Sequence, residues 1–461
     1  MFDPVVYYIL AGLLVFIIMF GIFLMSNVKY AKIGNILSAF AMLLAVLLTI
    51  LQYEIIDKWI IFPYLGVGAL IGIYLAYRVK MIEMPEMVAL LNGLGGLASL
   101  VVGAFAYFNI GVDISNNFSY IVAIIALMVG TITFVGSLIA ALKLHRIISG
   151  RPVRVKFYKT IITILFTLQL VAIVISPFKL INDLLFVVLL VVISSLFSLV
   201  FTLRIGGADM PITISLLNSF SGVAGAISGL AIGDVLLVAV GGIVGASGLI
   251  LTKIMCQAMN KTLIEILLGK TSNVIEVESD NEDENIDQSL EPKEDFKEIF
   301  LKSRSVIIVP GYGMAVAQAQ QLVKNLADIM KKDGKTVKFA IHPVAGRMPG
   351  HMNVLLAEAN VDYDDLYDME VINNEFKTTD LVLIVGANDV VNPKAKTHEG
   401  TPIYGMPVLD VEDANNIFIF NYDLKPGYSG VSNPLYKLNK AHLFLGDAKE
   451  TLKSFMDDLK I

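Results

Sequence analysis

The sequence predicts a chain of two unlike parts: a polytopic α-helical membrane domain of about nine spans, and a cytoplasmic α/β domain built on a doubly wound parallel sheet. Three observations lead to this prediction. Long apolar runs fill the chain up to residue 256, and only 16% of its 461 residues are charged, against about 25% in soluble proteins. An acidic stretch follows. Beyond residue 301, short apolar runs alternate with helical patterns.

The membrane part is predicted from run length, because a crossing helix needs about 20 mainly apolar residues. Nine stretches qualify, near 5–25, 31–52, 59–77, 84–108, 119–142, 160–177, 180–203, 211–231 and 233–255. The first run lacks the positive region of a signal peptide and is expected to be retained. Basic residues such as Lys29, Arg78 and Arg204 concentrate in alternate loops. The N-terminus should therefore lie outside the cell membrane, with the C-terminal part in the cytoplasm.

The acidic stretch is expected to be a solvated tether. Residues 271–300 hold eleven acidic residues and two lysines, a net charge of −9 against −6 for the whole chain. This composition predicts a flexible linker over 257–300, between a transmembrane domain (1–256) and a nucleotide-binding domain (301–461). No basic patch suggests nucleic acid. Cys256 is the single cysteine, so no intrachain disulfide can form, and nothing resembles a metal site.

Four polar side chains in or near the spans are candidates for a proton pathway. Asn92 and Asn218 lie within predicted spans, where amides serve either as links between helices or as partners for a file of water. Amides do not titrate near neutral pH. Glu86 and Asp209, near span ends, are the titratable candidates, or else solvated caps at the cytoplasmic rim. The many glycines of these spans are interpreted as sites of close helix packing.

A glycine-rich turn opens the cytoplasmic domain. Residues 304–320 combine a buried strand, a turn at Gly311 and Gly313, and a following helix. This order can bring a pyrophosphate against a helix N-terminus. Val316 stands where the usual motif has its third glycine. The second strand ends in His342 and not in the acid that binds a ribose 2′-hydroxyl, so the pattern favours a phosphorylated ribose.

Five strands and three helices are expected beyond residue 301. The strands are 306–309, 337–341, 381–385, 417–420 and 443–445, and the helices are 315–332, 352–360 and 448–459. Strands alternating with helices predict a mostly parallel sheet, with ligands at the carboxyl ends of its strands. The loops at those ends are 311–316, 342–351, 386–393 and 421–431, and they form the expected cofactor site.

Within these loops, Arg347 suits a phosphate or is a surface arginine. Asp389 could orient a ribose or an amide, or cap the next turn. Tyr428 offers a stacking face in a glycine-hinged lid, 425–430. The expected cofactor-binding residues are Gly311, Tyr312, Gly313, Met314, Ala315, Val316, Val344, Ala345, Gly346, Arg347, Met348, Pro349, Gly350, Gly386, Ala387, Asn388, Asp389, Asn421, Tyr422, Lys425, Gly427, Tyr428, Ser429 and Gly430.

Several motifs together resemble one protein family. They are Gly311-Tyr-Gly-Met-Ala-Val-Ala-Gln-Ala-Gln320, His342-Pro-Val-Ala-Gly-Arg347, Pro349-Gly-His-Met-Asn-Val-Leu-Leu-Ala-Glu-Ala359, Gly386-Ala-Asn-Asp389, Gly405-Met-Pro-Val408 and Gly206-Gly-Ala-Asp-Met-Pro211. With them, essentially the whole chain resembles the beta subunit of the proton-translocating NAD(P) transhydrogenases.

The resemblance implies a function. Members pass a hydride between NAD(H) on a separate alpha subunit and NADP(H) on the beta subunit, driven by proton movement through the membrane domain. The implied cytoplasmic domain is Rossmann-like, holds NADP(H) in a flipped orientation under a lid matching 423–431, and works in an assembly with a second copy of the chain. No catalytic acid or base is implied, because the hydride passes between two nicotinamides.

Two departures from the family pattern have consequences. Asn218 falls at a family channel position, but Asn92 stands where some members carry a proton-relaying histidine, so a water-mediated path is implied. Asn421-Tyr422 stands where familiar members have Lys-Arg for the 2′-phosphate. Lys425 is the candidate to replace them. We expect a preference for NADP(H) with reduced discrimination against NAD(H).

Two other classes of function compete with this interpretation. A secondary transporter or channel regulated by a nucleotide-binding domain would need a substrate cavity and, often, inverted repeats, and no repeat is visible. A membrane-anchored dehydrogenase complete in one chain would need its own acid/base pair, for which His342 and His351 are the nearby candidates.

Overall fold

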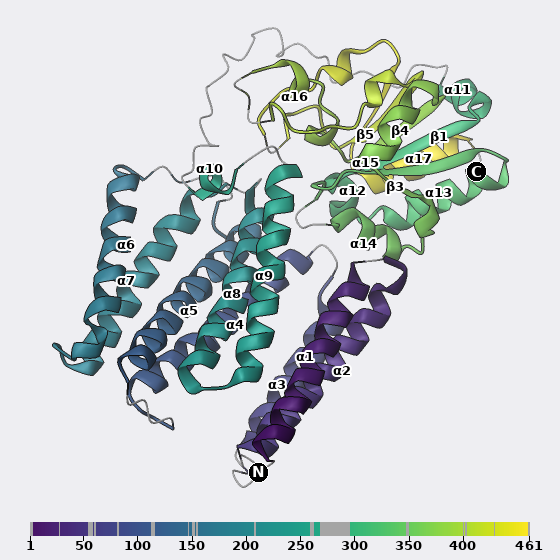
Figure 1. The fold of residues 1–461 in the computed structure, drawn as a ribbon. Coiled ribbons are helices and arrows are strands. Elements are labelled where there is room, and N and C mark those ends of the chain that lie inside the picture. The colour runs from purple at the N-terminus through teal and green to yellow at the C-terminus, as the bar shows by residue number, and fades with distance from the viewer. Residues whose placement is uncertain are drawn as a thin grey trace. The chain divides into compact units, whose positions relative to one another are not determined.

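The computed structural model describes residues 3–26, 28–53, 59, 61–80, 83–111, 116–145, 147–149, 153, 155–206, 209–258, 262–267, 296–346, 350–399, 401, 403–427 and 429–459. Contacts between residues divide the chain into two compact units. The first unit is Met1–Ile205 with Thr213–Thr252, and the second is Gly206–Ile212 with Lys253–Ile461. Figure 1 shows the elements of both.

Long apolar helices make up the first unit. They are α1 (Pro4–Met25), α2 (Val28–Gln52), α3 (Ile61–Arg78), α4 (Met84–Tyr107), α5 (Asn117–Leu144), α6 (Tyr158–Ile175), α7 (Asp183–Arg204), α8 (Met210–Ile232), whose first residues belong to the second unit, and α9 (Val235–Ala258), whose last residues belong to it as well. Among the described residues, these nine are long and apolar enough to cross a membrane. The predicted membrane domain is confirmed in this respect.

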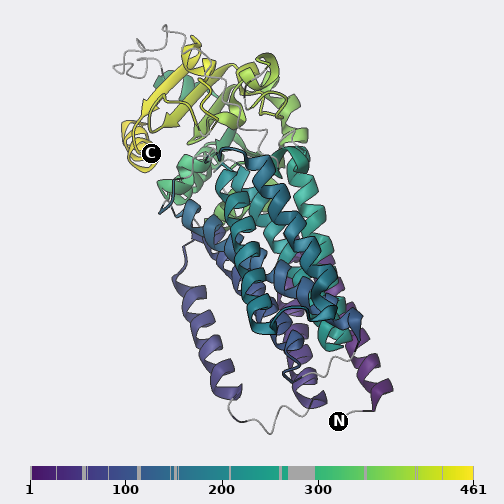
Figure 2. The ribbon, with the colours of Figure 1, turned by 90° about the vertical axis from the view of Figure 1, so that its left-hand side faces the viewer.

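Glycines bring α4 and α5 into close contact. A Cβ atom added at Gly96 would lie 2.8 Å from the carbonyl oxygen of Gly130, and one at Gly103 would lie 2.7 Å from that of Ala123. The two helix backbones therefore pack at a distance that only glycine permits. Helix α3 differs, because it has no buried residue, and Figure 2 shows its ribbon apart from the other helices of this unit.

The second unit contains a six-stranded sheet in the order β3-β2-β1-β4-β5-β6. The strands are β1 (Ser305–Pro310), β2 (Thr336–Ile341), β3 (Leu366–Asp368), β4 (Leu381–Val385), β5 (Asn416–Asn421) and β6 (Ala441–Leu445). All five pairings are parallel. The order reverses between β1 and β4, which is where ligands bind in doubly wound sheets. The predicted Rossmann-like fold class is confirmed.

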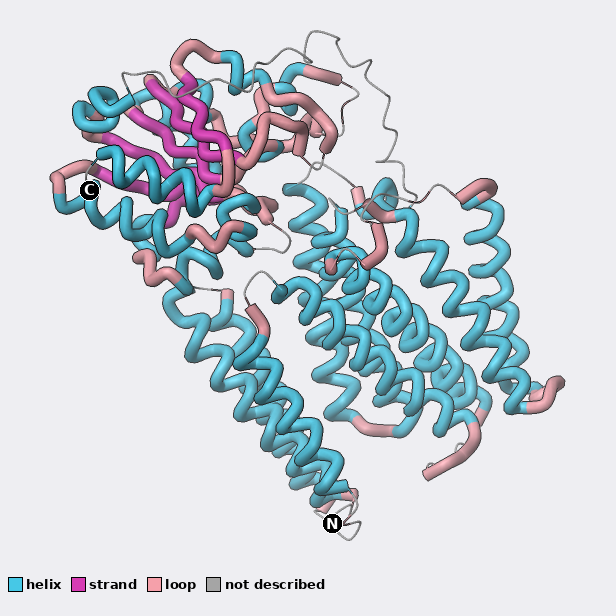
Figure 3. Tube along the Cα trace, turned by 180° about the vertical axis from the view of Figure 1, so that it is seen from behind, coloured by secondary structure: helices cyan, strands magenta, loops and turns pink. Residues whose placement is uncertain are grey.

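Helices cover this sheet, as the tube in Figure 3 shows. The helices of the second unit beyond α9 are α10 (Leu263–Leu267), α11 (Phe296–Lys302), α12 (Tyr312–Val316), α13 (Gln320–Lys332), α14 (His351–Glu358), α15 (Met369–Ile372), α16 (Lys394–Thr397) and α17 (Ala448–Leu459). The prediction of one helix over 315–332 is wrong. The chain breaks after α12, where Gln318 takes a left-handed backbone conformation with φ 52° before α13 begins.

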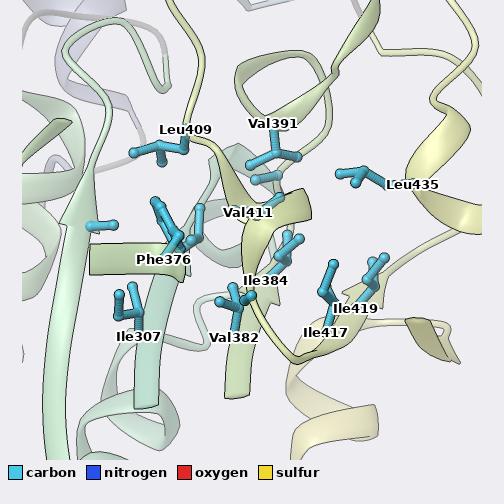
Figure 4. Close-up of a cluster of buried hydrophobic side chains, with 14 of the residues drawn as sticks. Ile307, Phe376, Val382, Ile384, Val391, Leu409, Val411, Ile417, Ile419 and Leu435 are labelled. Carbon is cyan, nitrogen blue, oxygen red and sulfur yellow. The ribbon is translucent and has the colours of Figure 1, made fainter. Parts of the chain in front are cut away.

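Each face of the sheet has its own core. On one face, Ile417 and Ile419 of β5 join aliphatic residues of β1 and β4 (Figure 4). On the other, Phe418 and Phe420 make edge-to-face contacts with the ring of Phe455 of α17. Phe300 of α11 packs on the same ring at 5.4 Å, so residues that the sequence assigns to the linker belong to this core. Burial on both faces explains the continuous apolar runs of these strands.

Candidate functional site

The loops that follow β1 and β4 interlock at the point where the strand order reverses. A Cβ at Gly311 would lie 2.2 Å from the carbonyl oxygen of Gly386, and one at Gly313 would lie 2.7 Å from its Cα. The Gly313 N–H donates to the Gly386 carbonyl at 2.8 Å. Gly386 itself takes φ +68°, which favours glycine. Three of the predicted glycines thus meet, and they keep side chains away from the switch point.

The loop after β2 is organised by a buried histidine. His342 is 2% exposed, and its Nε2 lies 2.7 Å from the carbonyl oxygen of Pro407. Its Nδ1 accepts a hydrogen bond from the Val344 N–H at 3.3 Å. Burial lowers the pKa of His342 to about 4, so the ring is neutral at physiological pH and donates from Nε2. A neutral ring tied on both sides holds the loop in place and is a poor acid/base candidate.

The same loop continues towards α14. Gly346 takes φ +104°, and a Cβ there would lie 2.3 Å from Nδ1 of His351, so no side chain fits. His351 is fully buried at the start of α14. The candidates Arg347, Met348 and Pro349 lie outside the described residues, as does Tyr428 of the lid.

The loop after β4 holds the predicted lid. Asp389 accepts hydrogen bonds from Ser429, through the backbone N–H at 3.1 Å and the hydroxyl at 2.6 Å. The Asn388 side chain donates to the Lys425 carbonyl at 3.1 Å. A Cβ at Gly427 would lie 2.9 Å from the Asp389 carboxylate. The structure therefore brings together candidates from two loops that are about forty residues apart in the chain.

Residues outside the predicted site hold the chain just beyond the far end of the lid. The Asn392 side chain donates to the Ser432 carbonyl at 3.2 Å, and Lys394 Nζ donates to the Ser432 hydroxyl at 2.6 Å. The Asn433 side chain donates to Asn388 Oδ1 at 3.1 Å. No local pattern marks these residues as lid anchors, because their partners come from distant loops.

The end of β5 differs from the expectation of a phosphate grip. Asn421 is 7% exposed, and its amide donates to the Ala387 carbonyl at 3.0 Å and to the Tyr436 hydroxyl at 3.1 Å. Both of its N–H groups are used inside the fold. Tyr422, in contrast, is 78% exposed. Lys425 is exposed as well, with Nζ 3.9 Å from Asp423.

The candidates for a proton pathway are two amides within helices and two carboxylates near helix ends. Asn92 of α4 is 7% exposed, and its Nδ2 lies 3.5 Å from the carbonyl oxygen of Ile214 in α8. Asn218 is half-buried one turn beyond Ile214, so both amides belong to the part of the first unit where α4 meets α8. Glu86 is half-buried in the first turn of α4. Asp209 is buried just before α8, within the second unit.

Comparison with known proteins agrees with the motifs. The family model for the NAD(P) transhydrogenase beta subunit matches residues 5–458. Two relatives from Rhodospirillum rubrum, each named NAD(P) transhydrogenase subunit beta, are 40% identical over 453 residues, which cover 96% of this chain and 96% of each relative. The apolar helices and the parallel sheet are what this similarity predicts. The chain is therefore a membrane protein that belongs to the NAD(P) transhydrogenase beta subunit family.

Proposed function

We propose that this chain binds NADP(H) and couples hydride transfer between NADH and NADP⁺ to proton translocation across the membrane. The observation that carries the proposal is the interlocked pair of loops at the switch point. There Gly311, Gly313 and Gly386 present backbone atoms only, so no side chain stands between the loops and a ligand. The lid 423–431 is tied to the same loop through Asp389. A dinucleotide fits such a site, because its pyrophosphate needs close approach to the backbone.

The bound nicotinamide supplies the hydride chemistry, so the chain contributes position and access. The buried, neutral His342 supports this division, because both of its ring nitrogens are hydrogen-bonded to the backbone and hold a loop in place. NAD(H) belongs on a separate alpha subunit, and a second copy of this chain completes the assembly. The proposed location is the inner cell membrane, with the N-terminus outside and the nucleotide-binding part in the cytoplasm.

The proposed cofactor preference is NADP(H) over NAD(H), with modest discrimination. Both N–H groups of Asn421 are used within the fold, and Tyr422 carries no charge. Lys425 is then the cation of the lid that can meet a 2′-phosphate, and its high exposure makes the ionic contact weak.

Calorimetry on the full chain in detergent tests the preference, with NADPH and NADH as ligands. Lys425→Ala should weaken NADPH binding and leave NADH binding unchanged. Lys332→Ala is the matched control. This exposed lysine is the last residue of α13, a helix that leads away from the strand ends that form the site. Equal affinity of the unmodified chain for the two dinucleotides would refute the preference.

Reconstitution tests the coupling. The chain and an alpha subunit are placed in liposomes, and hydride transfer from NADH to a thionicotinamide analogue of NADP⁺ is followed together with the internal pH. We expect the rate to rise with a proton gradient and fall when a protonophore collapses it. Hydride transfer at full speed under both conditions would refute proton coupling.

A further inference from the structure

A buried lysine near the end of α5 has no role in the function proposed above. Lys143 is 3% exposed. Its Nζ donates to the carbonyl oxygens of Leu203 at 2.6 Å, Ile205 at 2.8 Å and Thr202 at 3.2 Å. These acceptors use all three N–H groups of the ammonium. A lysine in a spanning helix is costly and normally needs a functional reason or a partner.

The partner of Lys143 is the end of a helix. Among the described residues no carboxylate lies within ion-pair distance of Nζ, and the charge meets the carbonyls that close α7. A cation is favoured there, because the last carbonyls of a helix have no i→i−4 donor from the helix itself and carry the negative end of its dipole. Lys143 therefore attaches the end of α5 to the end of α7 and to Ile205, the residue that leaves α7 in an extended conformation.

Ile205 is the last residue of the first unit before the chain passes into the second. Residues 206–212 group by their contacts with Lys253–Ile461, and the chain returns to the first unit at Thr213. Within the second unit, Ile212 packs on Met255, Cys256 and Ile266. The short segment 206–212 therefore groups with the second unit, although the chain before and after it groups with the first.

The chain also has a contact with the first unit just after segment 206–212. Nδ2 of Asn92 in α4 lies 3.5 Å from the carbonyl oxygen of Ile214, two residues after the segment ends. Lys143 of α5 holds the residue before the segment. Both contacts come from α4 and α5, the pair whose backbones approach closely at Gly96 and Gly103. One closely packed helix pair therefore contacts the chain on both sides of 206–212.

We propose that Lys143 is a positioning residue for coupling, which fixes the start of segment 206–212 to the α4–α5 pair so that the proton gradient can act on hydride transfer. This inference rests on the proposed function. Coupling between two sites requires an element whose position both sites influence. Asn92 belongs to the candidate proton pathway and holds one side of the segment. Lys143 holds Ile205, the residue before the segment. A change in the surroundings of Asn92 would then move the end of segment 206–212 while its start stays in place.

The test uses the full chain with an alpha subunit in liposomes. The measured quantity is the ratio of the hydride-transfer rate with an imposed proton gradient to the rate after a protonophore collapses it. Lys143→Met removes all three donors at similar length, and we expect its ratio to fall close to one. Its affinity for NADPH should stay within about twofold of the unmodified chain, since the nucleotide site is untouched. Lys143→Arg keeps donors and charge, and it should retain most of the response.

The matched control is Lys159→Met, which removes an exposed lysine in the first turn of α6 and should leave the ratio unchanged. A lysine with a merely structural role would lower the amount of folded protein in Lys143→Met and leave the ratio at its normal value, and that result would overturn the proposal. If Lys143→Met does not accumulate, Lys143→Gln provides the same comparison with two uncharged donors. If the unmodified chain itself ignores the gradient, the proposed function fails and not this inference.

Discussion

The carboxylate of Asp389 accepts two hydrogen bonds from one residue of the lid, Ser429. The backbone N–H of Ser429 donates to Oδ2 at 3.1 Å, and its hydroxyl donates to Oδ1 at 2.6 Å. Gly427 lies so close that a Cβ there would approach the same carboxylate to 2.9 Å. The loop after β4 therefore holds the lid in the conformation seen here. Release of a nucleotide from under the lid would require these bonds to break.

Asp389→Asn should speed release of NADPH. The substitution keeps the shape of the side chain but removes the charge that strengthens both hydrogen bonds, and hydrogen bonds to charged groups contribute about 1.5–3 kcal/mol when well shielded. The site is partly exposed, so we expect the rate constant of dissociation to rise roughly 10-fold. Stopped-flow fluorescence of bound NADPH measures it, with the exposed Asp457→Asn on α17 as control. An unchanged dissociation rate in Asp389→Asn would show that this latch does not limit release.

Gly311→Ala should destabilise the nucleotide-binding part of the chain. The new methyl group would lie 2.2 Å from the Gly386 carbonyl oxygen and 2.5 Å from the Ala387 Cα, and backbone atoms cannot rotate away as a flexible side chain can. Overpacking of this kind typically costs about 1–3 kcal/mol. The temperature at which NADPH binding is lost should fall, whereas Ala317→Ser, at a half-buried position on the same loop-to-helix segment, should leave it unchanged. Equal stability of the two variants would mean that the loops separate easily.

The stability of the same part should depend on pH through His342. Burial lowers the pKa of this histidine to about 4 in the folded chain, below its ordinary value of 6.5. The folded state thus favours the neutral ring, so this contribution is fully present above pH 6.5 and is lost as the pH falls from 6.5 towards 4. A shift of this size corresponds to up to about 3 kcal/mol.

Unfolding measured between pH 7 and pH 4 checks the prediction. His342→Gln should remove much of the loss of stability on acidification, although it starts from a lower stability because the bond to Pro407 is altered. His398→Gln, at an exposed histidine, is the control and should keep the normal slope. The prediction fails if His342→Gln and the unmodified chain lose stability in parallel.

Asn218→Leu should slow proton-coupled turnover without weakening nucleotide binding. Asn218 is half-buried on α8, one turn from the carbonyl that receives Asn92, and leucine offers no hydrogen bond to water there. Loss of even about 1.4 kcal/mol of stabilisation slows a step 10-fold, so we expect a decrease of at least roughly that size. Turnover under a gradient and NADPH affinity are both measured. Leu230→Ala, at an exposed position on α8, is the control, and a loss of NADPH affinity in Asn218→Leu would contradict the prediction.

The sequence alone determined the class of this protein, because its strongest signals are local. A membrane helix is recognised by the length of an apolar run, and the nine described helices match the nine predicted runs to within a few residues. Five of the six strands were predicted for the same reason, as each is a short apolar run. The glycine loops were also predictable, since a turn that requires glycine shows it directly in the sequence.

Only the tertiary structure decided what depends on partners far along the chain. Strand β3 has three residues and no apolar run, and it exists through its pairing with β2. The break at Gln318 lies in a stretch of good helix formers. Asn421 turns inward because the Ala387 carbonyl and the Tyr436 hydroxyl are there to receive it. Lys143 turns onto α7 because the last carbonyls of that helix are not used up by its own i→i−4 hydrogen bonds and can accept from the ammonium. A polar group takes its role from the partners that folding brings to it, and residue type and spacing do not record them.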